Sequence, residues 1–361
     1  MRTRGWWALL LAAVLTLPAQ ASSAPSVVPN AAVCGGPGFT LLQSPLRRSC
    51  VHTTPDGYDG RLQARWAGIT PATAPPVCYG DGQSGARVQL IYGYPAGQPD
   101  RESVIVPQVR ALMAPRMQAV IKASSAGKDL GIRFAFDAPC ARLSVPVVRF
   151  PASTVASPGA DDQFLKIRDE LIRLGYTRTD RKYEVIWDWW NNKGICGLGE
   201  LLYGADQPTP VNEHNGGPVV GSHTDPAGVL GLQDYADRAR YAAVWRSPTG
   251  PKGYNCFEMG QSHAEVQVHE LFHSLGAVQP SAPHSDSGGH CTDTPSVMCP
   301  AGRVPAVPSC GQQAVEVLDC GMDDYWNPNP ASGSYLSKAD NIATSQFFGP
   351  QLADRFVGAP V

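Results

Sequence analysis

The stretch HELFH (His269–His273) carries residue types and a spacing that could perform hydrolysis. On a helix, residues four apart leave the same face one turn apart, which is the separation that two ligands of one tetrahedral Zn²⁺ need. The carboxylate of Glu270 would lie beside this metal rather than on it. From there it can deprotonate a zinc-bound water and later return the proton to a leaving amine. The pattern therefore predicts zinc-dependent hydrolysis with His269 and His273 as ligands and Glu270 as the base.

A catalytic zinc needs a third protein ligand as well as one open position. In the extended pattern HExxHxxGxxH this ligand would stand at position 279, where the sequence has Gln279, whose amide oxygen binds zinc weakly. Two histidines follow downstream, and a proline-containing loop could bring His284 back to the metal. We therefore expect His284 to be the third ligand, with His290, Gln279 and Asp286 as alternatives.

The elements around this motif predict a mixed α/β fold with helices packed on a sheet. Ser262 and Glu265 form a capping box at the start of the zinc-binding helix, and Gly276 is placed to end it. Helical spacing of apolar residues is clearest over 161–174. Further helices are expected over 104–124 and 338–348, and strands over 87–94, 131–137, 143–150, 182–190 and 241–246.

The first residues have the three-part layout of a secretory signal, with a basic start, a short apolar run and small residues near the end. We expect residues 1–24 to be this signal and 25–77 to be an N-terminal extension or pro-segment. A catalytic subdomain would cover 78–276, and a C-terminal subdomain with the third ligand would cover 277–361. The apolar run is too short to span a bilayer, so the protein is expected to be secreted.

Composition narrows the range of partners. The formal net charge is -2, and no basic stripe or run of like charge occurs, which argues against nucleic acid and anionic membranes as partners. The 37 glycines and 33 prolines among 361 residues indicate a loop-rich fold. The expected partner is a protein or peptide substrate, and the expected state is a monomer.

The sequence has ten cysteines, and an even count in a secreted chain predicts disulfides. Neighbour pairing is the simplest arrangement, although spacing alone does not establish connectivity. It would join residues 34–50, 78–140, 196–256, 291–299 and 310–320. Cys291 and Cys299 are candidate zinc ligands too, but in an oxidising compartment a disulfide between them is favoured.

With HELFHSLG (His269–Gly276) followed by a methionine in SVMCP (Ser296–Pro300), the chain resembles the metzincin clan of zinc endopeptidases. Within that clan it is similar to secreted actinomycete-type metzincin-like proteins. That closer similarity rests on CYGDGQSGARVQ, GAVQPSAPHS, HCTD…VMC and DDYWNPNP…GSYL, which span about residues 78–348.

The resemblance implies a twisted five-stranded sheet with two helices above a cleft, the zinc helix at its base and an irregular C-terminal subdomain. It implies that Met298 forms a Met-turn beneath the metal. It also implies that the strand 241–246 is the edge strand along which an extended peptide binds by β-augmentation.

Two departures from the metzincin pattern bear on this reading. Gln279 replaces the usual third ligand, which moves the expectation to His284. Pro300 stands where some metzincins have a tyrosine that supports the tetrahedral intermediate. Tyr325 could supply a hydroxyl instead, although a packing role is favoured for it. A cysteine latch by Cys34 or Cys50 is a further alternative to their mutual disulfide.

The leading hypothesis is therefore a secreted zinc metalloendopeptidase. A non-catalytic extracellular binding protein that retains the zinc site is the main alternative, but Glu270 argues against it because metal binding alone does not need that carboxylate. Hydrolysis of a non-peptide amide would use the same site. A Ca²⁺ site at Asp323 and Asp324 is a further possibility, with solvated carboxylates as the favoured reading.

Overall fold

The computed structural model of the protein describes eleven segments of the chain, and every structural statement below concerns these residues. They are 39–52, 74–156, 159–189, 196–201, 239–246, 265–279, 281–286, 288–293, 296–299, 318–338 and 340–350. The predictions for residues 1–24 and for the capping serine at position 262 lie outside them.

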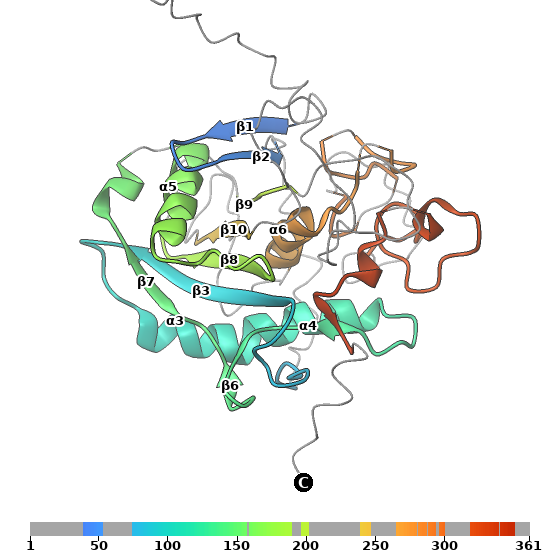
Figure 1. The fold of residues 1–361 in the computed structure, drawn as a ribbon, viewed down its shortest axis with the longest axis horizontal. Helices are drawn as coiled ribbons and strands as arrows, with labels where there is room; N and C mark the ends of the chain where they lie inside the picture. Colours follow the sequence, from blue (N-terminus) through green and yellow to red (C-terminus); the bar gives the residue numbers. More distant parts are fainter. Residues whose placement is uncertain are drawn as a thin grey trace, which may run out of the picture.

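A five-stranded mixed sheet forms the centre of the molecule (Figure 1). Its order is β7-β3-β8-β10-β9, and all neighbours are parallel except β9, which runs antiparallel to β10 at one edge. The strands are β3 (Arg87–Pro95), β7 (Val147–Phe150), β8 (Arg181–Trp187), β9 (Gly197–Gly199) and β10 (Arg240–Trp245). The predicted mixed α/β class with a five-stranded sheet is confirmed.

The position of β10 corrects one expectation. The resemblance implies that this strand is the edge of the sheet, but it lies between β8 and β9 and pairs with both. The edge is the three-residue strand β9, which the sequence does not predict. Its residues, Gly-Leu-Gly, show no alternation of apolar and polar side chains, and glycines usually indicate a turn.

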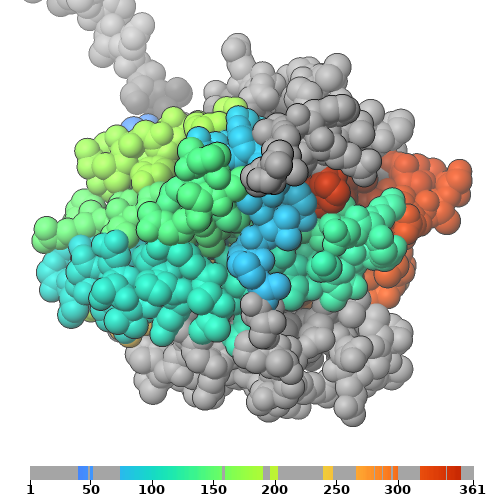
Figure 2. Space-filling view, turned by 90° about the horizontal axis from the view of Figure 1, so that it is seen from below, coloured from blue at the N-terminus to red at the C-terminus, as the bar shows by residue number. Residues whose placement is uncertain are grey.

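Helices cover both faces of the sheet because alternate strand residues point to opposite sides. On one face, α5 (Ala160–Arg173) packs Phe164, Ile167 and Leu171 against the strands. On the other lie α6 (Glu265–Leu275) and a continuous helical stretch. That stretch comprises α3 (Glu102–Gln108), a π-helical turn (Val109–Met113) and α4 (Ala114–Ala123). Figure 2, turned to view the molecule from below, shows α3 and α4 on this outer face with residues from 318 onward to one side.

A hairpin near the N-terminus extends the edge of the sheet. Strands β1 (Phe39–Gln43) and β2 (Arg48–His52) pair antiparallel, and Val51 forms an antiparallel bridge with Glu200, directly after β9. Leu42 and Val51 are buried in the same apolar cluster as α5. Residues 39–52 are therefore packed into the fold, although they lie within the stretch expected to be an extension or pro-segment.

Glu200 anchors this hairpin from a fully buried position. Its carboxylate lies 3.2 Å from the guanidinium of Arg47 in the hairpin and 3.8 Å from that of Arg168 in α5. It also accepts a hydrogen bond from the hydroxyl of Ser49. Burial alone would raise the pKa of Glu200, but the arginines Arg47, Arg168 and Arg240 together hold it below its ordinary value. The hairpin thus supplies charge and hydrogen bonds that a buried carboxylate requires.

The C-terminal part is largely irregular, as expected. The helix predicted over 338–348 is wrong: the structure has a 3₁₀ turn at Ile342–Thr344 and a short strand, β11 (Phe348–Gly349). The side chain of Asn341 accepts a hydrogen bond from the amide of Ala343, and Ser345 is extended, so the turn ends after three residues. β11 pairs with β4 (Gly131–Ile132), and the other short pair is β5 (Phe136–Asp137) with β6 (Arg142–Leu143).

Disulfides Cys78–Cys140 and Cys291–Cys299 confirm two of the predicted pairings. Cys50, Cys196 and Cys320 are also disulfide-bonded. The pairings predicted for these three each include a cysteine outside the described segments, so they stay predictions. Among the described helices, none combines the length and apolar character that a membrane span requires.

Candidate metal centre

Three histidine rings converge beside the helix α6. The Nε2 atom of His269 lies 3.0 Å from that of His273 and 3.3 Å from that of His290. These side chains are 4%, 0% and 1% exposed, respectively. The three ring nitrogens lie close enough together to hold one metal ion. The helix supplies two of them at the predicted i, i+4 spacing, and a loop supplies the third.

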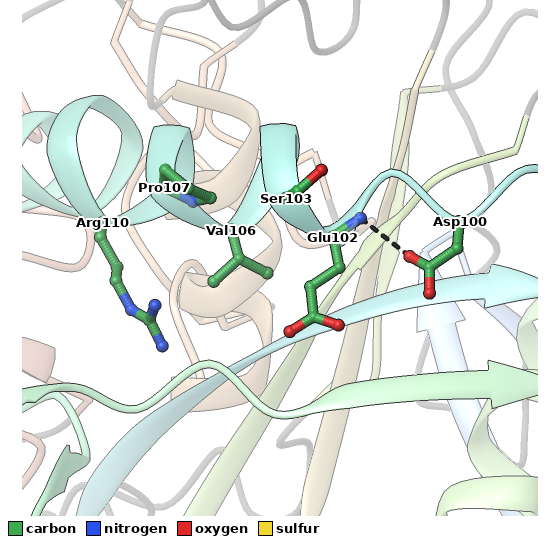
Figure 3. A pocket seen from close by; sticks show the side chains of 6 residues that line it. All are labelled: Asp100, Glu102, Ser103, Val106, Pro107 and Arg110. Carbon is green, nitrogen blue, oxygen red and sulfur yellow. Dashed lines mark hydrogen bonds between the residues drawn. The ribbon is translucent and has the colours of Figure 1, made fainter.

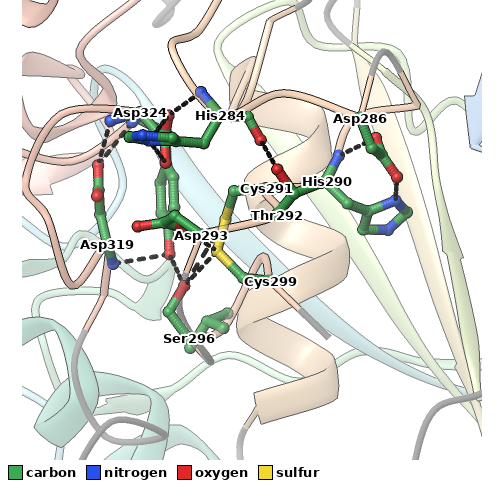
Figure 4. The surroundings of a disulfide bond; sticks show 12 residues. His284, Asp286, His290, Cys291, Thr292, Asp293, Ser296, Cys299, Asp319 and Asp324 are labelled. Atoms are coloured by element: carbon green, nitrogen blue, oxygen red, sulfur yellow. Dashed lines mark hydrogen bonds and ion pairs between the residues drawn. A yellow bond between two sulfur atoms is a disulfide. The ribbon is translucent and has the colours of Figure 1, made fainter. Parts of the chain in front are cut away.

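His290, and not His284, is the histidine that joins this group. His284 lies on the other side of the Cys291–Cys299 disulfide (Figure 4), with Nδ1 3.2 Å from each carboxylate oxygen of Asp324. Its side chain is 40% exposed, and its backbone amide also donates to Asp324. The expectation that His284 completes the site is therefore not met by the geometry.

Gln279 also lies outside the group. Its side-chain amide donates to the carbonyl of Gly276 at 2.9 Å, which satisfies one of the last carbonyls after the helix. Gly276 has a φ of 88°, so the helix ends in the left-handed turn that the sequence predicts. The side chain of Gln279 thus forms a hydrogen bond at the end of the helix and does not join the three histidines.

A tight turn between residues 285 and 291 explains why His290 is the histidine presented. Ser285 and Cys291 form an antiparallel bridge, and the amide of Asp286 donates to the carbonyl of His290 at 2.8 Å. Gly289, with a φ of +86°, packs against the ring of His273, where an added Cβ would lie 3.1 Å from Cε1. The chain reverses after His284, and the returning arm carries His290 to the helix.

The second ring nitrogens of two of these histidines face acceptors. Nδ1 of His269 lies 2.7 Å from the carbonyl of Val297, and Nδ1 of His290 faces the carboxylate of Asp286 at 3.7 Å. Burial would raise the pKa of Asp286, but its contacts with His290 and with the amides of Gly288 and His290 lower the pKa to about 2. Such outer partners orient histidine ligands at metal sites.

This arrangement fits a metal ion. The carbonyl of Val297 and the carboxylate of Asp286 only accept hydrogen bonds, so Nδ1 of each ring carries the hydrogen and each Nε2 presents a lone pair. Two lone pairs 3.3 Å apart repel each other unless a cation lies between them. Nitrogens about 2.0–2.1 Å from a tetrahedral Zn²⁺ are about 3.3 Å apart, which agrees with the observed spacings.

Glu270 lies where the edge strand β9 passes close to the helix. A Cβ added to Gly197 would lie 2.5 Å from Cγ of Glu270, and one added to Gly199 would lie 2.5 Å from its backbone oxygen. Glu270 is 3% exposed. The two glycines of β9 therefore allow a contact between strand and helix that no larger residue would permit.

Residues 296–299 close the site from the side of the disulfide. Met298 is fully buried, and its carbonyl accepts from the amide of Cys291 at 3.1 Å. The hydroxyl of Tyr325 lies 3.1 Å from that of Ser296 and accepts from the amide of Asp319. Tyr325 is fully buried against Phe272, which is the packing role favoured for it from the sequence.

Two further features contain charged groups. Ligand atoms of His284, Asp293, Asp323 and Asp324 lie within 4.8 Å of one another, and burial raises the pKa of Asp324 to about 6. The Ca²⁺ site considered for Asp323 and Asp324 stays a prediction.

A surface pocket lies at the start of α3 and is lined by Asp100, Glu102, Ser103, Val106, Pro107 and Arg110. In it, the carboxylate of Asp100 accepts a hydrogen bond from the amide of Glu102 (Figure 3). These residues offer neither a histidine nor a cysteine.

From the sequence, His290 is an alternative third ligand, and His284 is the expected one. The two residues that flank His290 in the sequence explain why it approaches the helix. Gly289 permits the close approach to His273, and Cys291 ties the loop to Cys299 beside Met298. Comparison with known proteins adds no assignment, because neither a known family model nor a curated protein matches the chain.

Proposed function

We propose that the protein is a secreted zinc metalloendopeptidase of the metzincin type, with His269, His273 and His290 as the zinc ligands. The convergence of the three buried Nε2 atoms carries this proposal. Three imidazoles are a ligand set that zinc uses in catalytic sites, where a fourth position stays open. Secretion is supported by the N-terminal pattern and by the disulfides, which persist in oxidising compartments.

Glu270 would act as the general base and acid. It follows the ligand His269 directly, so its carboxylate stands beside the ligand group without belonging to it. A zinc ion at this site supplies a Lewis acid that polarises a carbonyl and lowers the pKa of water. The carboxylate of Glu270 takes a proton from the attacking water and delivers it to the amine that leaves.

The fold adds support of a different kind. A five-stranded mixed sheet with an irregular C-terminal part agrees with what the metzincin resemblance implies. The fully buried Met298 follows Val297, whose carbonyl faces His269, and this agrees with a Met-turn near the ligands. The edge strand β9 runs beside Glu270, and the hairpin β1–β2 pairs with the chain directly after it, at Glu200.

The test compares Glu270→Gln with wild type for two properties. Zinc content by mass spectrometry should stay near one ion per molecule, because the substitution leaves the three histidines unchanged. Chelator-sensitive cleavage of a denatured protein or peptide library should fall by about 10²–10⁴-fold. Glu102→Gln, on the surface helix α3, is the matched control and should retain activity.

Two outcomes would contradict the proposal. If the wild-type protein binds zinc but cleaves no peptide in the library, the non-catalytic binding protein becomes the better reading. If Glu270→Gln cleaves as fast as wild type, the base has been misassigned.

A further inference from the structure

The hydroxyl group of Tyr325 contacts the short turn Ser296–Cys299. In this turn the amide of Cys299 donates to the carbonyl of Ser296 at 3.2 Å, so Val297 and Met298 are its two central residues. The Tyr325 oxygen lies 3.1 Å from the hydroxyl of Ser296, and the amide of Met298 also faces it. One side chain thus contacts the residues on both sides of Val297.

Val297 is the residue whose carbonyl faces the ring of His269, with its oxygen 2.7 Å from Nδ1. This carbonyl and the amide of Met298 belong to one peptide unit, which is planar and trans, so its C=O and its N–H point in opposite directions. The Tyr325 hydroxyl faces one end of that unit, and the His269 ring faces the other. A rotation of the unit would therefore move the carbonyl away from the ring.

The neighbours of the Tyr325 hydroxyl match its hydrogen-bonding capacity. The amides of Asp319, at 2.8 Å, and of Met298 can only donate, so the oxygen accepts from both. Its own hydrogen is left for the hydroxyl of Ser296, which in turn donates to Sγ of Cys299 at 3.1 Å. Tyr325 is fully buried, so solvent cannot replace these partners.

The rest of the structure holds Tyr325 in place. Its amide donates to the buried carboxylate of Asp319 at 2.7 Å, and its carbonyl accepts from the amide of Ile342 at 2.9 Å. Its ring packs edge-to-face against Phe272 of α6, with the ring centroids 6.1 Å apart. Phe272 directly precedes His273 in the chain. The hydroxyl is thus fixed relative to the helix that carries two of the three histidines.

We propose that Tyr325 is a positioning residue for the metal centre: its hydroxyl fixes the Val297–Met298 peptide unit, and this unit orients the ring of His269 for metal binding. The effect passes through hydrogen bonds alone, so no proton is transferred and no covalent bond changes. The consequence for the metal rests on the proposed function, because that proposal assigns His269 as a zinc ligand. The hydrogen bonds themselves can be tested without activity.

Tyr325→Phe removes the hydroxyl and keeps the ring. The dissociation constant for zinc, measured by competition with a coloured chelator, should rise by about 10-fold, because a partner behind a ligand histidine is lost. Tyr241→Phe is the matched control, since Tyr241 is also buried and donates to the carbonyl of Tyr176 at 2.6 Å. It packs in the cluster with α5 on the opposite face of the sheet.

Both tyrosine variants should lower the melting temperature, because each loses a buried hydrogen bond. Only Tyr325→Phe should weaken zinc binding, which separates positioning from a purely structural role. Wild-type zinc affinity in Tyr325→Phe, or an equal loss of affinity in Tyr241→Phe, would overturn the proposal.

Ser296→Ala tests the route through the peptide unit. It removes one contact of the Tyr325 hydroxyl but leaves the Met298 amide facing the oxygen, so zinc affinity should stay near that of wild type. If Ser296→Ala weakens zinc binding as strongly as Tyr325→Phe, the hydroxyl does not act through the peptide unit, and the proposal is wrong.

Nuclear magnetic resonance with isotope-labelled histidine supplies a readout independent of turnover. The Nδ1 hydrogen of His269 donates to the Val297 carbonyl, so its resonance should lie downfield and should move upfield in Tyr325→Phe but not in Tyr241→Phe. An unchanged resonance would contradict the proposal. If zinc affinity and resonance respond as expected but no peptide is cleaved, the proposed function alone fails.

Hydrogen exchange of the wild-type protein keeps the test decisive if Tyr325→Phe does not fold. The amides of Met298 and Asp319 donate to the same buried oxygen, so both should exchange slowly. Rapid exchange of the Met298 amide beside a protected Asp319 amide would overturn the proposal.

Discussion

The Nε2 atoms of His269 and His290 lie 3.3 Å apart, although 21 positions separate the two residues in the chain. Each ring is turned by a different partner: the Val297 carbonyl faces Nδ1 of His269, and the Asp286 carboxylate faces Nδ1 of His290. Both Nε2 atoms thus lie close together beside the helix α6. This relationship distinguishes the group from three histidines that merely pack together.

The first prediction concerns the third ligand. His290→Ala should lower zinc affinity by at least about 100-fold, because it removes one of the three proposed protein ligands. His284→Ala is the control, since His284 contacts Asp324 instead, and it should retain full zinc occupancy. Metal analysis after dialysis against a weak chelator measures both. Loss of zinc in His284→Ala alone would contradict the geometry.

The second prediction concerns the contact between β9 and Glu270. In Gly197→Ala the new methyl group would stand 2.5 Å from Cγ of Glu270, so that side chain must move. We expect kcat/KM to fall by about 10–100-fold because the base is displaced, while zinc content stays unchanged.

Ile91→Ala serves as the comparison, because Ile91 packs on the opposite face of the sheet with α5. It should lower the free energy of unfolding by about 2–4 kcal/mol without a comparable loss of turnover by the folded protein. Equal effects of the two variants on kcat/KM would show that Gly197 acts only through stability.

The third prediction concerns the hairpin and Glu200. Glu200→Gln removes the negative charge that faces the buried Arg168, so the free energy of unfolding should fall by about 3–5 kcal/mol. The surrounding arginines hold the pKa of Glu200 below its ordinary value of 4.5 in the folded state. A lowered folded-state pKa gives stability that is present above the ordinary pKa and lost as the pH falls through the folded-state pKa.

The difference in stability between wild type and Glu200→Gln should therefore be full at pH 7 and shrink below about pH 4.5. Chemical denaturation across this range measures it. Glu102→Gln, at an exposed position, should show no such pH-dependent difference. A constant difference at every pH would mean that charge is not the cause.

Strong periodicity and local motifs predict much of the fold. The helix expected over 161–174 spans Ala160–Arg173, and the strand expected over 182–190 spans Arg181–Trp187. Strand β9 escapes prediction because its role depends on contact with Glu270, which the local sequence does not contain. The hairpin β1–β2 is missed for a similar reason, since Glu200 and Arg168 lie far away in the chain.

At the site, too, local spacing predicts some residues, and contacts between distant parts of the chain determine another. His269, Glu270 and His273 share one helix, so spacing alone places them. His290 depends on a reversal of the chain, on a positive φ at Gly289 and on the later segment that Cys299 joins to it. By distance along the chain from the motif, His284 is the expected third ligand. In the structure, the turn brings His290 instead of His284 beside His269.

The Cys291–Cys299 disulfide joins the residue after His290 to the residue after Met298. We expect reduction to release both neighbours at once, so that the helix would retain two histidines but lose its hold on the third. Assembly of the complete centre would then follow oxidation. A chain in which Cys291 and Cys299 are still reduced would then carry the motif without the complete group of three histidines.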